Sequence, residues 1–263
     1  MSEPREEWHF DTGRVGRRVL VFDELDSTNA TALALASRER ERPELGLEGL
    51  AILAENQTAG RGRFSRVWRS RPGSGLLLSV VLDPPLELRR ASILTALAAV
   101  AVAEAVYRLT SIQARIKWPN DLLVRGKKIC GILIEQSSAT VVGIGLNLNQ
   151  TREEFDEAGL PEATSLAILS GREVNLRQAA EVVLRCFDLE YERLIGGERV
   201  AVEADWKWRT GLLGQHVEIE RSDGTRVLGR IKEMGFDGIE VERPDGAVSN
   251  LVPETIEHIR VVG

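Results

Sequence analysis

Residues 60–71, with the sequence GRGRFSRVWRSR, form an arginine segment whose composition suits the binding of an anion. The segment holds five arginines, and no aspartate or glutamate occurs between Asn56 and Leu82, although the formal net charge of the chain is -6. Such a local excess of positive charge predicts a bound anion. Gly60 and Gly62 let the backbone approach a ligand closely, and guanidinium groups around backbone amides suit a phosphate. The alternative interpretation is a solvated basic hairpin tip.

Two well-known phosphate loops do not match the arginine segment. The chain has no GxxxxGK sequence followed by serine or threonine, and Ser65 stands where a dinucleotide-binding fingerprint has its third glycine. Strand-like runs flank the segment at residues 50–54 and 76–82. The segment is therefore predicted to be a loop between two strands, and loops on rigid scaffolds often carry binding sites.

The composition limits the class of protein. With 263 residues, of which 43% are hydrophobic and 28% charged, the chain is predicted to be globular, as one large domain or a large and a small one. The pI of about 5.4 argues against general nucleic-acid affinity. The two cysteines and three histidines are scattered, which favours neither a zinc site nor histidine acid-base chemistry. The first residues are polar and do not resemble a signal peptide, so we expect a cytoplasmic protein.

Hydrophobic periodicity predicts helices and strands in a mixed order. Residues 91–109 are rich in alanine and contain Glu104, which favours a buried core helix over a membrane span. Residues 1–18 are too short for a domain. Strands are predicted at residues 19–22, 112–116, 122–124, 129–135 and 141–149, and helices from residue 28, from residue 175 to about 195, and at about 200–209.

The last fifty residues have a different character. Residues 214–262 consist of short alternating runs separated by three Asp-Gly pairs, which are hairpin signals. This pattern predicts a small all-β barrel. We place the boundary at residue 212, giving domains 1–211 and 212–263.

Several other residues have both a chemical and a structural interpretation. Lys117 precedes a rigid turn and could stabilise charge on an oxygen atom, or it could be an ordinary surface lysine. Asp121 and Glu135 could hold a divalent cation, or could be solvated carboxylates. Trp68 could cover a purine or fill the core. Ser27 or Thr28 could cap the helix that follows. Gly131, Gly143 and Gly145 lie in predicted strands and indicate close approach by a ligand or another backbone.

Taken in order, the motifs of this chain resemble biotin protein ligase, also called biotin–acetyl-CoA-carboxylase ligase. Each motif alone is weak, but the ordered set is specific, and the resemblance extends from about residue 19 to the end of the chain. The motifs are DSTN at 26–29, Gln57, GRGR at 60–63, Trp68, KWPND at 117–121, KICGILIE at 128–135 and GIGLNLN at 143–149.

The resemblance implies a fold and a reaction. The fold would be α+β, with a mixed sheet and packing helices of the class II aminoacyl-tRNA synthetase and biotin ligase type, followed by a C-terminal SH3-like β-barrel. Biotin and ATP, with Mg²⁺, would be the substrates of the first step, which gives biotinyl-5'-AMP and pyrophosphate. In the second step a specific lysine of the biotin carboxyl carrier protein would take the biotin and release AMP.

The family's functional residues carry over to matching positions. Arg63 and Lys117 would be catalytic, and no residue is fixed as a metal ligand. The implied biotin contacts are Ser27, Thr28, Asn29, Gln57, Arg61, Gly62, Arg63, Lys117 and Gly131. The implied ATP and adenylate contacts are Arg63, Arg66, Trp68 and Asn147.

Two features depart from the family pattern. Ser65 stands where the family loop usually has a glycine, which would alter loop closure. Some bacterial relatives carry an N-terminal winged helix-turn-helix that represses transcription, and residues 1–18 are too few for it. We therefore expect a monofunctional ligase with neither DNA nor a membrane as partner. The oligomeric state is left open, with a homodimer among the options because relatives often dimerise.

Three competing functions follow from the same sequence. A lipoate ligase or octanoyl transferase has the same fold, but those families lack the GRGR and KWPND pair. A binding module that senses biotin without catalysis is a second option, with Ser65 as its main support. A scaffold that binds proline-rich peptides is poorly supported, since residues 214–262 contain one aromatic residue, Phe236.

Overall fold

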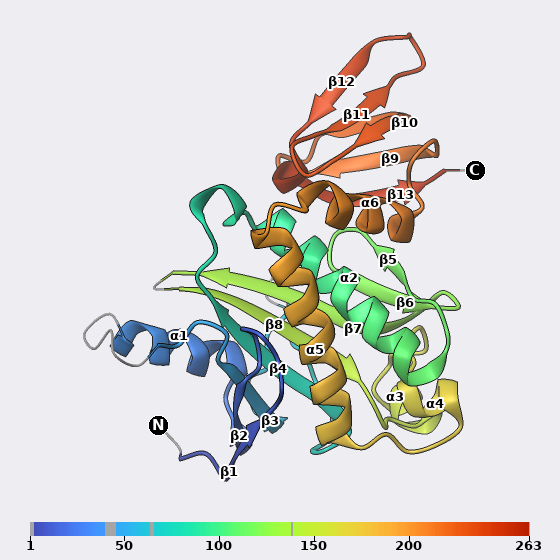
Figure 1. Ribbon diagram of the computed structural model, residues 1–263. Coiled ribbons are helices and arrows are strands. Elements are labelled where there is room, and N and C mark those ends of the chain that lie inside the picture. Colours follow the sequence, from blue (N-terminus) through green and yellow to red (C-terminus); the bar gives the residue numbers. More distant parts are fainter. Residues whose placement is uncertain (1–2, 40–45, 64–65, 138, 263) are drawn as a thin grey trace.

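The computed structural model describes residues 3–39, 46–63, 66–137 and 139–262. Its larger part is built on an eight-stranded mixed sheet with the order β1-β2-β3-β4-β8-β7-β6-β5 (Figure 1). Strands β2 and β3 pair in parallel, and the other neighbours are antiparallel. The strands are β1 (Glu6–His9), β2 (Arg18–Leu25), β3 (Ala51–Gln57), β4 (Gly75–Leu82), β5 (Arg115–Lys117), β6 (Asp121–Val124), β7 (Lys127–Gln136) and β8 (Thr140–Asn147). The predicted mixed sheet is confirmed.

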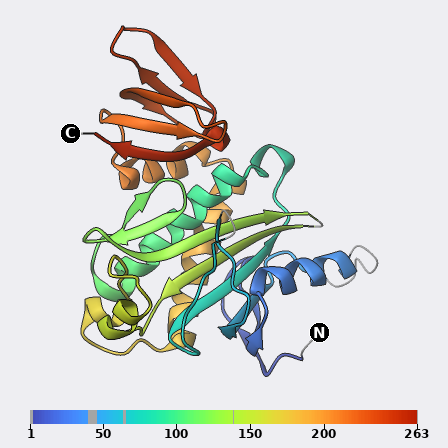
Figure 2. The same ribbon diagram turned by 180° about the vertical axis from the view of Figure 1, so that it is seen from behind.

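Helices pack on both faces of this sheet. On β2, Val19 and Val21 face the core that includes α2 (Ala91–Thr110) and α5 (Leu176–Ile195), whereas Leu20 and Phe22 face α1 (Thr28–Glu39). This alternation follows from the period of two in a strand. Figure 2 shows the described residues of the arginine segment on the face opposite α2 and α5.

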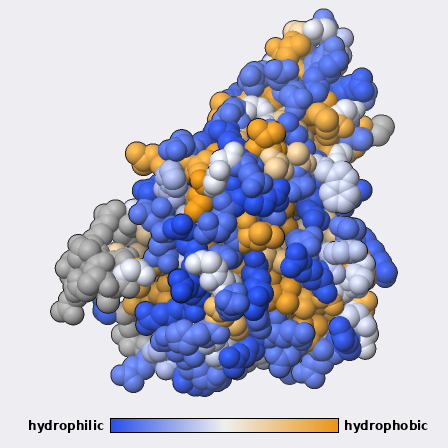
Figure 3. Space-filling view, in the orientation of Figure 1, coloured by the Kyte–Doolittle hydropathy of each residue, from blue (hydrophilic) through white to orange (hydrophobic). Residues whose placement is uncertain are grey.

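Helix α2 is a buried core helix, as predicted. It is the one described helix that is long and apolar enough to cross a membrane, but 67% of its apolar stretch is buried in the structure. It packs against α5 and against strands of the sheet. Figure 3 shows a mainly hydrophilic outer surface on this side, with scattered hydrophobic patches. The burial of α2 is that of a core helix.

The structure corrects some predicted boundaries. Residues 1–18 were given no element, yet β1 pairs with β2 and adds an edge strand to the sheet. The strand predicted at 112–116 begins at Arg115, because α2 continues to Thr110 and ends with Ser111 in the left-handed conformation. Strand β8 ends at Asn147, so Asn149 lies beyond it. Two short helices were not predicted, α3 (Arg152–Glu157) and α4 (Leu166–Ser170).

The C-terminal residues form a five-stranded antiparallel sheet with the order β12-β11-β10-β9-β13. It follows α6 (Arg199–Thr210). Each of the three Asp-Gly pairs lies between two consecutive strands, as the hairpin signals predicted. The strands are β9 (His216–Arg221), β10 (Arg226–Met234), β11 (Ile239–Glu242), β12 (Val248–Leu251) and β13 (Ile256–Val261).

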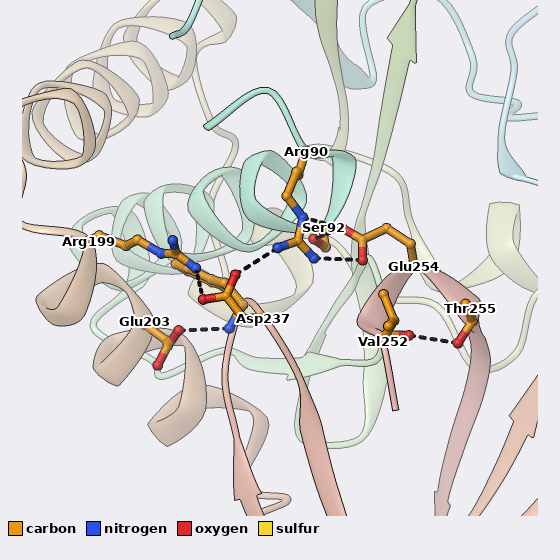
Figure 4. A network of polar contacts seen from close by, with 9 residues as sticks. Arg90, Ser92, Arg199, Glu203, Asp237, Val252, Glu254 and Thr255 are labelled. Atoms are coloured by element: carbon orange, nitrogen blue, oxygen red, sulfur yellow. Dashed lines mark hydrogen bonds and ion pairs between the residues drawn. The ribbon is translucent and has the colours of Figure 1, made fainter. Parts of the chain in front are cut away.

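Polar and aromatic contacts join this sheet to the larger part. Arg90, at the start of α2, pairs with both Asp237 and Glu254, and Arg199 also pairs with Asp237 (Figure 4). Nearby, the ring of Trp206 lies 5.9 Å from Trp118 and 5.5 Å from Phe236, measured between centroids. The two parts therefore share one continuous hydrophobic core.

Candidate active site

All twelve residues predicted to bind biotin or ATP line one cavity of about 500 Å³. The cavity lies on the face of the sheet opposite α2 and α5, where Gly131 and Leu133 alternate with the core residues Cys130 and Ile132. The twelve residues are Ser27, Thr28, Asn29, Gln57, Arg61, Gly62, Arg63, Arg66, Trp68, Lys117, Gly131 and Asn147. The structure thus brings together residues that are up to 120 positions apart.

Polar residues at the start of α1 form one wall of the cavity. Ser27, Thr28 and Asn29 are each only 4% exposed. The Thr28 backbone N–H and hydroxyl donate to Oε1 of Gln57 at 2.7 and 3.1 Å. The Ser27 hydroxyl accepts from Nε of Arg61 at 3.4 Å. These side chains therefore make contacts across the site, beyond the helix-capping role that the sequence also allowed.

The glycines of β7 and β8 form the floor of the cavity. A Cβ on Gly145 would lie 2.6 Å from the Trp68 ring, and one on Gly131 would lie 3.0 Å from it. A Cβ on Gly143 would lie 2.5 Å from Oδ1 of Asn29. The sequence predicted close approach by a ligand or another backbone at these glycines, whereas the groups that approach them in the structure are side chains of the protein. A ligand that touches Gly131 requires the Trp68 ring to shift.

The Trp68 side chain combines an unpaired indole N–H with a nearby ammonium group. Its indole N–H is buried without a hydrogen-bond partner in the described part of the chain. The ammonium group of Lys128 lies 5.6 Å from the ring centroid, a cation-π distance. Burial of an unpaired N–H is unfavourable, so movement of this ring out of the floor would remove that cost.

Several cations surround the cavity. Burial lowers the pKa of the Arg63 guanidinium, and the charges of Glu257 and Asp121 partly oppose this. Arginine nevertheless remains a cation in proteins. Lys117 is exposed at the end of β5 and Arg66 is exposed on the arginine segment. The predicted effect of Ser65 on loop closure concerns a residue outside those that the structure describes.

Lys128 is a cavity residue that the sequence analysis missed as a binding group. Its ammonium lies 2.6 Å from the Asp121 carboxylate and would lie 3.5 Å from a Cβ on Gly131. A regular strand would place residues 128 and 131 on opposite faces. The pairing of β6 and β7 shifts register between Leu122 and Leu123, and this bulge puts Lys128 on the same face as Gly131. The motif KICGILIE held the lysine, but spacing alone did not reveal its direction.

Asn147, the last residue of β8, also lines the cavity. It is 5% exposed, its Nδ2 donates to the Thr164 carbonyl at 3.0 Å, and its Oδ1 accepts from Gln150 at 3.2 Å. Its amide is therefore fixed by neighbouring chain segments.

A second cavity of about 1260 Å³ adjoins the first, and most of the described residues of the arginine segment, including Arg61, Arg63 and Trp68, line both. Its other walls include Ser92 of α2, Trp118, Phe236 between β10 and β11, and Ile256 of β13. The site is thus open toward the junction between the two parts of the molecule.

Comparison with known proteins places the chain in a family. Residues 22–149 match the Biotin/lipoate A/B protein ligase family. The chain is 33% identical over 263 residues to the bifunctional ligase/repressor BirA of Bacillus subtilis, covering 98% of this chain and 79% of the relative. It is 34% identical over 232 residues to the biotin–acetyl-CoA-carboxylase ligase of Mycobacterium tuberculosis, covering 84% and 82%.

A solved structure shows the same fold. The biotin protein ligase from Aquifex aeolicus, in complex with biotin and ATP, superposes with a TM-score of 0.74 and 26% identity. The match covers 93% of this chain and 99% of that one. With the identities to curated relatives and the cavity lined by the family's motifs, the chain belongs to the biotin protein ligase family and is a ligase of the biotin–acetyl-CoA-carboxylase type.

Proposed function

We propose that this enzyme forms biotinyl-5'-AMP from biotin and ATP and transfers the biotin to a specific lysine of the biotin carboxyl carrier protein of acetyl-CoA carboxylase or a related carboxylase. The observation that supports this most strongly is the single cavity that contains all twelve matched residues. It combines a polar wall, a glycine floor and clustered cations, which suit a small acid and a nucleotide.

The cations would serve the first step. An oxygen of the biotin carboxylate attacks the α-phosphorus of ATP, and the bond to the leaving pyrophosphate breaks. Both reactants are anions, so Arg63 and Lys117 would reduce their repulsion and stabilise the charge on the five-coordinate phosphorus. Lys128, which points into the same cavity, would add a further cation.

The second step needs access for a protein. The amine of the acceptor lysine attacks the acyl carbon of the adenylate, loses a proton, and AMP departs with the electron pair of the broken bond. The larger cavity would admit this lysine from the junction between the two parts of the molecule. The arginine segment would shield the adenylate from water until then.

Mg²⁺ would enter with ATP as its counter-ion. No group of three or more metal-binding side chains lies together within the described ranges. Of the two carboxylates considered from the sequence, Asp121 pairs with Lys128, and Glu135 pairs with Arg61. Each of these carboxylates therefore already has a cationic partner in the protein.

One assay tests the proposal. The purified protein is incubated with biotin, ATP, Mg²⁺ and a carrier domain, and AMP release and the mass of the carrier are measured. We expect AMP together with a carrier adduct of biotin mass. Lipoate replaces biotin in a parallel reaction because the family also includes lipoate ligases. Biotin binding without pyrophosphate release would instead support a sensing module.

We also propose how the chain is organised and where it acts. Residues 212–263 would be an SH3-like domain attached to a catalytic domain of residues 1–211. The described residues before β2 contain strand β1 and no helix-turn-helix, so we propose that this part of the chain does not bind an operator. A mobility-shift assay tests that proposal. A cytoplasmic location and a homodimer are further proposals, to be tested by cell fractionation and sedimentation.

A further inference from the structure

Two polar side chains that are not among the predicted biotin contacts connect five residues that are. Glu135 on β7 and Ser79 on β4 contact the side chains that line the cavity from α1 and the arginine segment. Nδ2 of Asn29 donates to Oε2 of Glu135 at 2.7 Å, and Arg61 donates to Oε1 at 2.8 Å. With the contacts of Thr28 to Gln57 and of Arg61 to Ser27, these bonds form one connected network.

The network has a defined hydrogen-bond direction. The Ser79 hydroxyl, which is fully buried, lies 2.5 Å from Oδ1 of Asn29 and 2.7 Å from the Thr28 hydroxyl oxygen. Oδ1 of Asn29 accepts from the Ser79 hydroxyl, and its Nδ2 donates to Glu135. Arg61 has donors alone. Glu135 therefore receives one donor on each of its two oxygens.

We propose that Glu135 is a positioning residue of the ligase, whose carboxylate holds Arg61 and Asn29 in the arrangement that binds biotin. This inference rests on the proposed function. Glu135 acts through its two partners: one oxygen fixes the first arginine of the arginine segment, and the other fixes the amide orientation of Asn29. Holding both groups before the ligand arrives reduces the ordering cost of binding.

The position of Glu135 suits this role. It lies on a strand inside the sheet, paired with Val141 of β8, and its side chain is 23% exposed. Arg61 is 42% exposed and belongs to a loop, so its direction depends on an anchor. A rigid strand is a better anchor than a second loop.

The test is the isosteric variant Glu135→Gln. Its amide keeps the volume of the side chain but must turn its NH₂ toward either Arg61 or Asn29, which also donate. We expect the Kd and the KM for biotin to rise at least about tenfold, with a much smaller change in kcat, because a hydrogen bond to a charged group is lost. Binding is measured by calorimetry without ATP, and turnover by AMP release.

Glu154→Gln is the matched control. Glu154 pairs with Arg71 at the other end of the arginine segment and does not line either cavity. A glutamine there retains an oxygen for the Thr151 N–H of the α3 capping box. We expect its Kd for biotin to stay within about twofold of the wild type, as is usual for an exposed pair.

A double-mutant cycle with Arg61→Gln separates positioning from a general structural effect. If Glu135 acts through Arg61, the effect of the double variant on biotin affinity is clearly smaller than the product of the two single effects. Equal losses in Glu135→Gln and Glu154→Gln, or fully additive effects in the cycle, contradict the proposal.

Thermal unfolding of each variant shows whether it is folded. If Glu135→Gln does not fold, Arg61→Gln still tests the contact between Glu135 and Arg61, because it removes the other partner. A wild-type protein that binds no biotin contradicts the proposed function. Wild-type binding with an unaltered Glu135→Gln variant contradicts only the positioning role.

Discussion

At the scale of single residues, the direction of one lysine side chain decides whether its positive charge lies in the cavity. Lys128 reaches the cavity because of the bulge between β6 and β7, and its ammonium lies beside Asp121 and the Trp68 ring. Its neighbour Lys127 lies one pair further along the same strand and bonds to the Pro161 carbonyl at 3.2 Å. Two adjacent lysines thus have different surroundings and are expected to have different roles.

We predict that Lys128→Ala lowers the kcat of adenylate formation by about 100-fold or more, the usual effect of removing a group that stabilises transition-state charge. Pyrophosphate release in the presence of biotin and ATP measures this. Lys127→Ala is the control and should change the rate by less than about threefold. Similar rates for both variants contradict a role for Lys128 in charge stabilisation.

The Trp68 side chain reports the position of the arginine segment. Trp68 rests on Gly131 and Gly145, in the space where a biotin contact with Gly131 is proposed. Binding therefore requires the indole to move to a new environment. We predict a change in tryptophan emission when biotin binds, and its loss in Trp68→Phe. Emission that responds equally in both proteins would assign the signal to another tryptophan.

Helix α5 holds the segment that leads into β2. The Asp188 carboxylate accepts from the backbone N–H groups of Gly13, Arg14 and Val15 at 2.7, 2.8 and 2.7 Å. Val15 is fully buried, so its N–H has no access to water once the carboxylate is removed. The N-terminal edge of the sheet is thereby fastened to the core.

We predict that Asp188→Ala lowers the free energy of unfolding by about 3 kcal/mol, because buried donors lose an ionised acceptor. Denaturant unfolding followed by circular dichroism measures this loss. Glu192→Ala, one turn further along α5, removes an exposed pair with Arg14 and should cost less than about 1 kcal/mol. Equal losses would show that Asp188 contributes no more than a surface pair.

At the scale of the molecule, charges at the junction make the attachment of the C-terminal sheet sensitive to pH. Hydrogen bonding from Arg199, together with the charge of Arg90, lowers the pKa of Asp237. Burial alone would raise the pKa of Glu254, but hydrogen bonds from Arg90 and Ser92 outweigh it, so this pKa is also lowered. Figure 4 shows both carboxylates meeting Arg90.

A lowered folded-state pKa means that these carboxylates stabilise the fold above their unfolded pKa of about 4, and that this stabilisation is lost as the pH falls through the folded values. We predict that, as the pH falls below about 4, the melting temperature of the wild type decreases more steeply than that of Arg90→Gln. Parallel pH profiles for the two proteins would contradict a contribution from this junction.

The sequence by itself determined the local features. Residues 91–109 contain a long alanine-rich stretch, and the structure forms α2 there, because a helix depends on neighbouring residues. The three Asp-Gly pairs predicted the C-terminal hairpins for the same reason. The ordered motifs predicted which residues share the cavity, since they match the pattern of a family whose fold brings them together.

The tertiary structure decided what depends on distant pairing. Strand β1 is too short and polar to be recognised alone, and it exists because β2 offers an edge. The direction of Lys128 depends on the register between β6 and β7, and the partners of Glu135 come from residues 29 and 61. The side of the sheet on which a strand residue lies follows from the register of its pairing. This register depends on segments that are far apart in the chain, so local spacing does not encode it.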